Sequence, residues 1–83
     1  MTPKNTSKLI AVADRDHTVT INDKTYGPFG RLLGNRRRVE VYEEGLVYRA
    51  VSYDERDEIE WETRFPKQTT VVSVEKYKWT YPQ

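Results

Sequence analysis

A chain of 83 residues without cysteine forms one domain at most, and it has neither a disulfide framework nor a thiolate metal site. No apolar run approaches the roughly 18 residues of a membrane span, and the N-terminal residues lack the apolar core of a secretory signal, so we expect a cytoplasmic protein with no membrane contact. Charged residues make up 33% of the chain and hydrophobic residues only 36%, but two Trp, six Tyr and two Phe argue for an ordered β fold over a disordered one.

The net charge of +1 is unevenly distributed along the chain. Residues 1–38 hold eight Lys and Arg and three Asp, a net charge of +5, whereas residues 39–83 hold six Lys and Arg and ten Asp and Glu, a net charge of −4. This asymmetry predicts one basic and one acidic surface on the folded protein.

The first part of the chain predicts a flexible end and then a hairpin and a half. Residues 1–7 are polar with an early proline, which is typical of a frayed N-terminal end, and residues 8–82 are expected to form a single β domain. A short apolar run at 8–13 predicts one strand, and alternating β-branched residues at 18–21 predict a second. Residues 25–26 begin a third.

The stretch from 27 to 30 is rich in glycine and proline and interrupts regular structure. Arg31, Leu32 and Leu33 that follow predict at most one short helical turn near 29–34, which would need tertiary contacts to be stable.

Residues 36–65 predict three consecutive antiparallel strands joined by two short polar turns. A turn centred on Glu44-Gly45 would pair Val41 with Tyr48, and a four-residue loop at 54–57 would pair Ala50 with Trp61. A three-residue turn at 43–45 would shift the first hairpin by one position. The preferred register collects one apolar face, made of Val39, Val41, Tyr48, Ala50, Ser52, Ile59 and Trp61. The opposite face then carries a cross-strand charge row, made of Glu40, Arg49 and Glu62.

Residues 69–81 predict a long closing strand with a β-bulge near Glu75-Lys76, because the apolar and aromatic residues change phase there. Short strands with a turn about every ten residues indicate an all-β fold. We expect a small antiparallel barrel or strongly bent sheet of five to six strands, either SH3-like or OB-like.

The sequence offers little for catalysis or metal binding. His17 is the one histidine and lies in an expected turn, so we predict no metal site. No nucleophile motif, phosphate-binding loop or dinucleotide fingerprint is present. We therefore expect no cofactor and no enzymatic activity.

Arginines dominate the predicted basic site. Arg36, Arg37 and Arg38 lead into a strand, and Arg31 and Lys24 precede them. Guanidinium groups suit bidentate contacts to phosphates, and nearby aromatic rings can stack on bases. The leading hypothesis is a non-enzymatic barrel that binds DNA or RNA through these five residues.

The alternative hypothesis is a protein–protein interaction module, an adaptor or an inhibitor of phage or mobile-element origin. Its docking surface would be the acidic stretch after residue 53, or an exposed sheet edge, which also leaves a homodimer open. The candidate docking residues are Asp54, Glu55, Glu58, Glu60 and Glu62, the last three expected along one exposed strand face.

One sequence pattern resembles a known domain. D-x-T-V-x-I-N-x-x-x-Y at residues 16–26, followed by R-R-V-E-V-Y-x-x-G at residues 37–45, is loosely similar to the small C-terminal β-barrel of Mu-type transposases. The matching residues include no part of that family's catalytic domain. The resemblance implies an accessory role in nucleic-acid binding.

Overall fold

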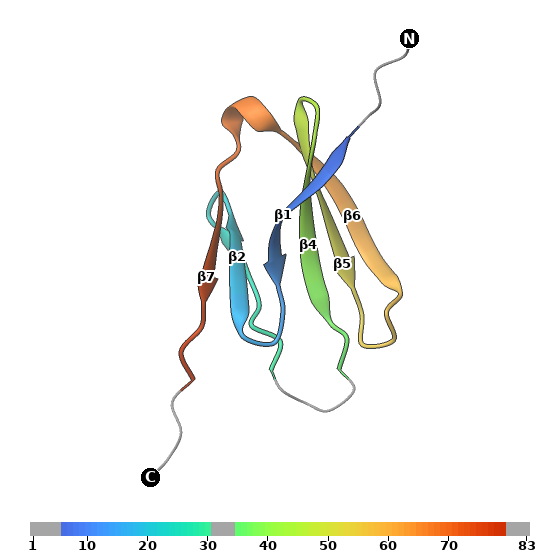
Figure 1. Ribbon diagram of the computed structural model, residues 1–83, viewed down its shortest axis with the longest axis vertical. Coiled ribbons are helices and arrows are strands. Elements are labelled where there is room, and N and C mark those ends of the chain that lie inside the picture. The colour runs from blue at the N-terminus through green and yellow to red at the C-terminus, as the bar shows by residue number, and fades with distance from the viewer. Residues whose placement is uncertain (1–5, 31–34, 80–83) are drawn as a thin grey trace.

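Figure 1 shows the computed structural model, which describes residues 6–30 and 35–79. Within these ranges the chain forms seven strands in two antiparallel sheets and one short 3-10 helix. The elements are β1 (Ser7–Ala13), β2 (His17–Ile21), β3 (Lys24–Tyr26), β4 (Arg38–Glu44), β5 (Val47–Tyr53), β6 (Ile59–Pro66), η1 (Lys67–Thr69) and β7 (Val72–Lys76). The all-β class is confirmed, with seven strands where five to six were expected.

The larger sheet has the strand order β1-β4-β5-β6, and the smaller sheet has the order β3-β2-β7 (Figure 1). Consecutive strands pair as hairpins in both sheets, whereas β1 pairs with β4 and β2 pairs with β7 across long stretches of chain. In the described ranges no strand ladder joins the two sheets. Within these ranges the strands thus form two separate sheets packed together, where a single barrel or bent sheet was expected.

The core lies between the facing sides of these sheets. The larger sheet contributes Val39, Val41 and Ala50, and the smaller sheet contributes Val19 and Ile21. The four aliphatic residues other than Ala50 alternate with polar neighbours, as half-buried strands require, whereas Ala50 is followed by the apolar Val51. Partly buried side chains surround this aliphatic centre, and they are Tyr26, Phe29, Tyr48, Trp61, Phe65 and Val72.

The predicted register of both meander hairpins is wrong by two residues. Val41 lies opposite Ala50 rather than Tyr48, and Ala50 lies opposite Thr63 rather than Trp61. The first turn consists of Gly45 and Leu46 alone, because Glu44 already pairs with Val47. A shift of two residues keeps every side chain on its face, so most of the predicted apolar face is confirmed despite the error.

One residue of the predicted apolar face is on the wrong side. The β5–β6 register shifts between Ser52, which lies opposite Trp61, and Tyr53, which lies opposite Ile59. Glu60 has no partner and forms a β-bulge, which reverses the facing of residues before it. Ile59 is consequently 60% exposed.

The last predicted strand is shorter and more regular than expected. β7 pairs with β2 without interruption up to Lys76, so the predicted bulge at Glu75-Lys76 is wrong. After β7 the chain is held against the β1–β2 turn by two hydrogen bonds to Asp16. The Tyr77 backbone N–H donates to the Asp16 carbonyl, and the Trp79 indole N–H donates to the Asp16 carboxylate at 3.0 Å.

The short helical turn predicted near 29–34 lies mostly outside the described residues, and Phe29 and Gly30 before it are not helical. The 3-10 turn of the structure instead follows Pro66, where only the end of a strand was expected. Most of the predicted flexible end also lies outside the described residues, but Ser7 belongs to β1 and pairs with Glu44. In the described part of the chain, no helix has the length and apolarity to cross a membrane.

Gly27 shows why the connection after β3 needs a glycine. Its φ is +81°, and an added Cβ would lie 2.8 Å from the His17 carbonyl oxygen. Both the left-handed backbone and this close approach exclude a larger side chain. The glycine thus lets the chain leave β3 in close contact with the first residue of β2.

The thin core makes single valines important for stability. Val41 is fully buried and Val71 is 69% exposed. We expect Val41→Ala to lower the unfolding free energy by about 2–3 kcal/mol, because two buried methyl groups and their contacts are lost. Urea unfolding followed by circular dichroism measures this change. Val71→Ala is the matched control and should stay within about 0.5 kcal/mol; an equal loss for both variants would contradict the assigned core.

Candidate functional site

The predicted basic residues fall at different places in the fold. Arg36 and Arg37 lie in the connection that precedes β4, with exposed side chains, and Arg38 is the first residue of β4. Lys24 begins β3 in the other sheet. Arg31 lies outside the described residues. The structure therefore groups three of the five predicted phosphate-binding residues and leaves Lys24 separate from them.

Arg38 is engaged in contacts within the protein. Its Nε donates to Glu40 at 3.0 Å, its Nη1 donates to Asp57 at 2.6 Å, and its guanidinium lies 3.9 Å from the centre of the Tyr53 ring. Burial opposes its charge, but the two carboxylate hydrogen bonds outweigh this effect and raise the pKa of Arg38. With Nε and Nη1 both bonded to carboxylates of the protein, Arg38 has less capacity left for a phosphate.

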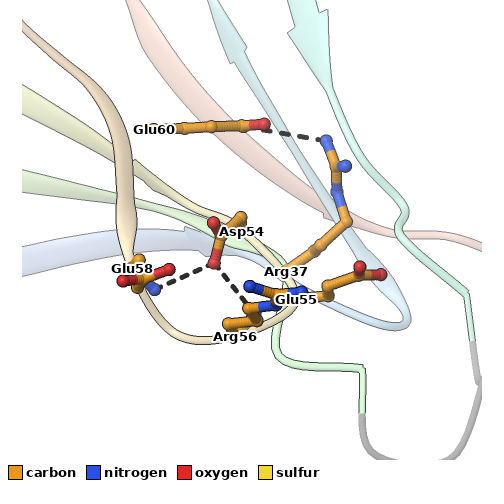
Figure 2. A pocket seen from close by; sticks show the side chains of 6 residues that line it. All are labelled: Arg37, Asp54, Glu55, Arg56, Glu58 and Glu60. Atoms are coloured by element: carbon orange, nitrogen blue, oxygen red, sulfur yellow. Dashed lines mark hydrogen bonds and ion pairs between the residues drawn. The ribbon is translucent and has the colours of Figure 1, made fainter.

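Arg37 lies beside the acidic loop between β5 and β6. Its guanidinium is 3.8 Å from the Glu60 carboxylate and 5.5 Å from the centre of the Phe29 ring. Together with that loop it encloses a polar pocket of about 310 Å³. We call it the carboxylate pocket (Figure 2), and its lining consists of Arg37, Asp54, Glu55, Arg56, Glu58 and Glu60.

Asp54 organises this pocket from within the chain. Its Oδ1 accepts hydrogen bonds at 2.9 Å from the backbone N–H groups of both Arg56 and Glu58. Asp57 completes the turn with a φ of 69°, a left-handed conformation that Asp tolerates better than most residues. The Oδ1 atom of Asp54 therefore fixes the shape of the loop that carries Glu55 and Glu58.

The predicted row of glutamates is not a row in the structure. Glu58 lies in the loop, Glu60 occupies the bulge, and Glu62 is on the regular part of β6. Glu60 accepts a hydrogen bond from Ser52 at 3.2 Å, whereas Glu62 accepts one from Arg49 at 2.8 Å. The bulge separates these residues, so Glu58 and Glu60 line the pocket without Glu62.

Glu62 instead belongs to a network on the outer face of the larger sheet, the side that points away from the core. Ion pairs, hydrogen bonds and ring contacts join the members of this network, which come from β4, β5, β6 and the β5–β6 loop. They are Arg38, Glu40, Tyr42, Glu44, Arg49, Tyr53, Asp57 and Glu62. The predicted charge row of Glu40, Arg49 and Glu62 is thus part of a larger set. Val51 on this face is fully buried.

Hydrogen bonding holds two pKa values of this network away from their ordinary range. Burial alone would raise the pKa of Glu40, but hydrogen bonds from Tyr42 and Arg38 outweigh it and lower the pKa below 4.5. The Tyr42 hydroxyl donates to Glu40 at 2.7 Å. This bond, together with burial, raises the pKa of Tyr42 from 10.0 to about 12.

Two residues of the site were not selected by sequence reasoning. Arg56 lines the carboxylate pocket, and Asp57 pairs with Arg38. Arg56 is the one cation within an otherwise acidic loop, which was a usable signal. The contact from Asp57 joins residues 19 positions apart and depends on the register, so no local pattern indicated it.

His17 lies at the start of β2, with its Nδ1 2.9 Å from the Asp14 carboxylate. Asp14 also accepts hydrogen bonds from the backbone N–H groups of Asp16 and His17. The pair closes the β1–β2 turn. Among residues 6–30 and 35–79, no group of three or more His, Asp or Glu side chains is arranged to hold a metal ion.

Comparison with known proteins gives no family for the chain: no family model, curated protein or solved structure matches it. The resemblance to the barrel of Mu-type transposases consequently stays a prediction.

The hydrogen bond between Tyr42 and Glu40 predicts a specific pH dependence. We expect Tyr42→Phe to lower stability at pH 7 by about 1–2 kcal/mol, because Glu40 loses a donor in a half-buried position. The lowered pKa of Glu40 means that its contribution exists above pH 4.5 and is lost as the pH falls through its folded value. The raised pKa of Tyr42 means that the bond contributes below pH 10.0 and is lost as the pH rises towards about 12.

Chemical unfolding of both proteins from pH 3 to pH 12 measures this difference, which should shrink at both ends of the range. Tyr77→Phe is the matched control, because Tyr77 is 45% exposed and contacts the Trp79 ring instead. A difference that does not vary with pH would contradict the role given to the Tyr42 hydroxyl.

Proposed function

We propose that this protein is a non-enzymatic interaction module that docks on a protein partner through the carboxylate pocket. The observation that carries the proposal is the pocket's composition, with four carboxylates and two arginines around about 310 Å³. The excess of negative charge in a concave site suits a lysine or arginine side chain of a partner.

The internal contacts of the site favour a basic partner over a phosphate. Arg38 is neutralised by Glu40 and Asp57, and Arg37 lies close to Glu60. A phosphate approaching Arg37 would meet the surrounding carboxylates, whereas an incoming cation would find them already positioned by the Asp54 turn. Figure 2 shows the Glu60 carboxylate directed towards Arg37, so a partner cation would share Glu60 with it.

A tetra-arginine peptide provides a direct probe of the docking hypothesis. Titrated into ¹⁵N-labelled protein at low salt, it should shift the amide signals of residues 54–60 in a saturable way. The double variant Glu58→Gln, Glu60→Gln should weaken binding about fivefold, because each exposed ion pair contributes up to about 1 kcal/mol.

Glu75→Gln is the matched control, since Glu75 is exposed on β7 and is not part of the pocket lining. It removes one carboxylate charge by the same Glu-to-Gln change and should leave the affinity within about twofold. Saturable shifts confined to other surfaces, or equal weakening by the control, would contradict docking through the carboxylate pocket.

Nucleic-acid binding is the second candidate, and a specific observation supports it. The side chain of Arg36 is exposed, and Arg37 lies over the Phe29 ring. Lys24 lies 5.3 Å from the centre of the Tyr26 ring on the other sheet. Cations beside aromatic rings are the combination that binds single strands through phosphate contact and base stacking.

This candidate predicts a strong salt dependence. Affinity for a fluorescent single-stranded 20-nucleotide DNA should fall steeply between 50 and 200 mM salt, with a slope that decreases by about 0.7 for each phosphate contact removed. Arg36→Ala with Arg37→Ala should lower both affinity and slope, whereas Lys76→Ala on β7 should leave the slope unchanged. Unmeasurable binding of the DNA and of its RNA equivalent at 50 mM salt would exclude this function.

The more detailed expectations for the chain stay predictions beside these proposals. They are the closed SH3-like or OB-like barrel, the cytoplasmic location and the phage or mobile-element origin.

A further inference from the structure

The longest of the strands that the structure describes lies at an open edge of the larger sheet. β6 spans eight residues and pairs with β5 on one side. In the described part of the chain no strand pairs with its other side, and Figure 1 shows β6 at the end of the sheet opposite β1. Such an edge presents unpaired backbone groups that can bind another strand.

The other edges are less suited to pairing. β3 has three residues and β7 has five. β1 has an irregular register between Leu9 and Ala11, and its free side lies beside β2 and β7 of the smaller sheet. The bulge at Glu60 limits the regular part of β6 to residues 61–66, which is still longer than the regular part of any of these edges. β6 is therefore the edge on which a second strand can form the longest regular ladder.

The hydrogen-bond phase of β6 identifies which residues point outward. The backbone N–H of Lys67 donates to the carbonyl of Leu46 at 2.9 Å, which extends the β5–β6 ladder by one bond. Because the direction of the backbone groups alternates along a strand, Phe65 and Thr63 also direct theirs towards β5. Glu62 and Arg64 then direct their N–H and C=O groups towards the open side.

The side chains on β6 are complementary to those on a second, antiparallel copy of β6. If two antiparallel copies of β6 meet with Thr63 at the two-fold axis, Glu62 of each copy lies opposite Arg64 of the other. Trp61 then lies opposite Phe65 on the inner face. Opposite charges and aromatic pairs at such positions each stabilise an antiparallel ladder by up to about 1 kcal/mol.

We propose that the protein forms a symmetric dimer in which β6 pairs with β6 of a second copy, centred on Thr63. The two larger sheets then join into one continuous eight-stranded sheet. Glu62 and Arg64 exchange both backbone hydrogen bonds across the axis, twice by symmetry. Glu62, Thr63 and Arg64 are exposed in the single chain, and this pairing would cover them.

The same charges disfavour the neighbouring registers. A ladder centred on Glu62 places two glutamates opposite each other, and one centred on Arg64 places two arginines opposite each other. A ladder centred on Trp61 sets Glu60 against Glu62. Like charges at directly opposed positions destabilise a strand pair, so the edge residues select one register and one partner.

Charge-reversal variants of the full-length protein test this pairing. Sedimentation equilibrium should detect a reversible wild-type dimer at about 0.1–1 mM, as expected for a small interface. Arg64→Glu alone and Glu62→Arg alone should each weaken the dimer at least tenfold, because every cross-axis pair becomes repulsive. An equimolar mixture of the two variants should recover dimers, since each cross-axis pair is then opposite in sign.

A second variant tests the register without changing charge. The chain has no cysteine, so in Thr63→Cys a disulfide forms only between copies. A central pair that is not hydrogen-bonded has Cα atoms about 4.5 Å apart, within disulfide range. Mild oxidation should link this variant at least tenfold faster than Thr25→Cys, its control on the exposed edge strand β3.

Three outcomes would overturn the proposal. One is a wild-type protein that stays monomeric at 1 mM, which would leave β6 to a different partner strand or to solvent. Another is a dimer that is indifferent to both charge reversals. The third is equal crosslinking of the Thr63→Cys and Thr25→Cys variants. Because none of these measurements involves the carboxylate pocket, they do not depend on the proposed function.

Discussion

This protein can fully bury only small side chains, and that limit constrains the rest of the structure. Among the described residues, no fully buried side chain is larger than Ile21, and most are valine or alanine. A chain of 83 residues encloses little volume between two sheets, so bulky rings do not fit at the centre. Tyr26 and Trp61 instead lie at the margin, with ring centres 5.4 Å apart. The aromatic residues therefore cover the sides of a small aliphatic core.

A core of this size gives the outer face of the larger sheet unusual importance. Val51 points away from the core and yet is fully buried. Its neighbours across the strands are Glu40 and Glu62, and each of these carboxylates is held by an arginine. The aliphatic parts of such long side chains cover apolar surface while their charged ends remain hydrated. The network on this face thus acts as a second packing layer over Val51. Its ion pairs hold the charged side chains in the positions in which they cover Val51.

Alternation along the strands was sufficient to predict the fold class and most of the faces, but it could not determine the register. Val39, Val41 and Ala50 share a face in any register that differs by two residues, since the side-chain period is two. Only the turn separates these registers, and the turn depends on Leu46. An apolar residue at this position is more typical of a strand than of a turn, but Leu46 is 86% exposed and forms half of a two-residue turn. The bulge at Glu60 is equally invisible to alternation, because one unpaired residue leaves the local pattern unchanged.

The charge pattern of the sequence likewise does not indicate which charged residues meet in the fold. The sequence separates basic residues before position 39 from acidic residues after it, and this separation predicted two surfaces. In an antiparallel meander, however, the start of β4 lies beside the end of β5 and the loop after it. Arg38 therefore lies against Asp57, and Arg37 lies against Glu60. Charges that are distant in the chain become partners in the fold, so the site combines both signs and the acidic excess is concentrated around one pocket.

The charged residues of β6 influence which strand can pair with its open edge, and in which register. Edge strands with charged residues usually resist pairing, because a random approach brings like charges together. On β6 the order of Glu60, Glu62 and Arg64 makes this resistance selective, since only one antiparallel register opposes unlike charges without opposing like ones. Glu62 also binds Arg49 within its own sheet, at 2.8 Å, which restricts the rotamers of an edge carboxylate that would otherwise be free. The network that covers Val51 and the edge that selects a partner strand therefore share one residue, and a change at Glu62 affects both the packing of the sheet and its capacity to extend.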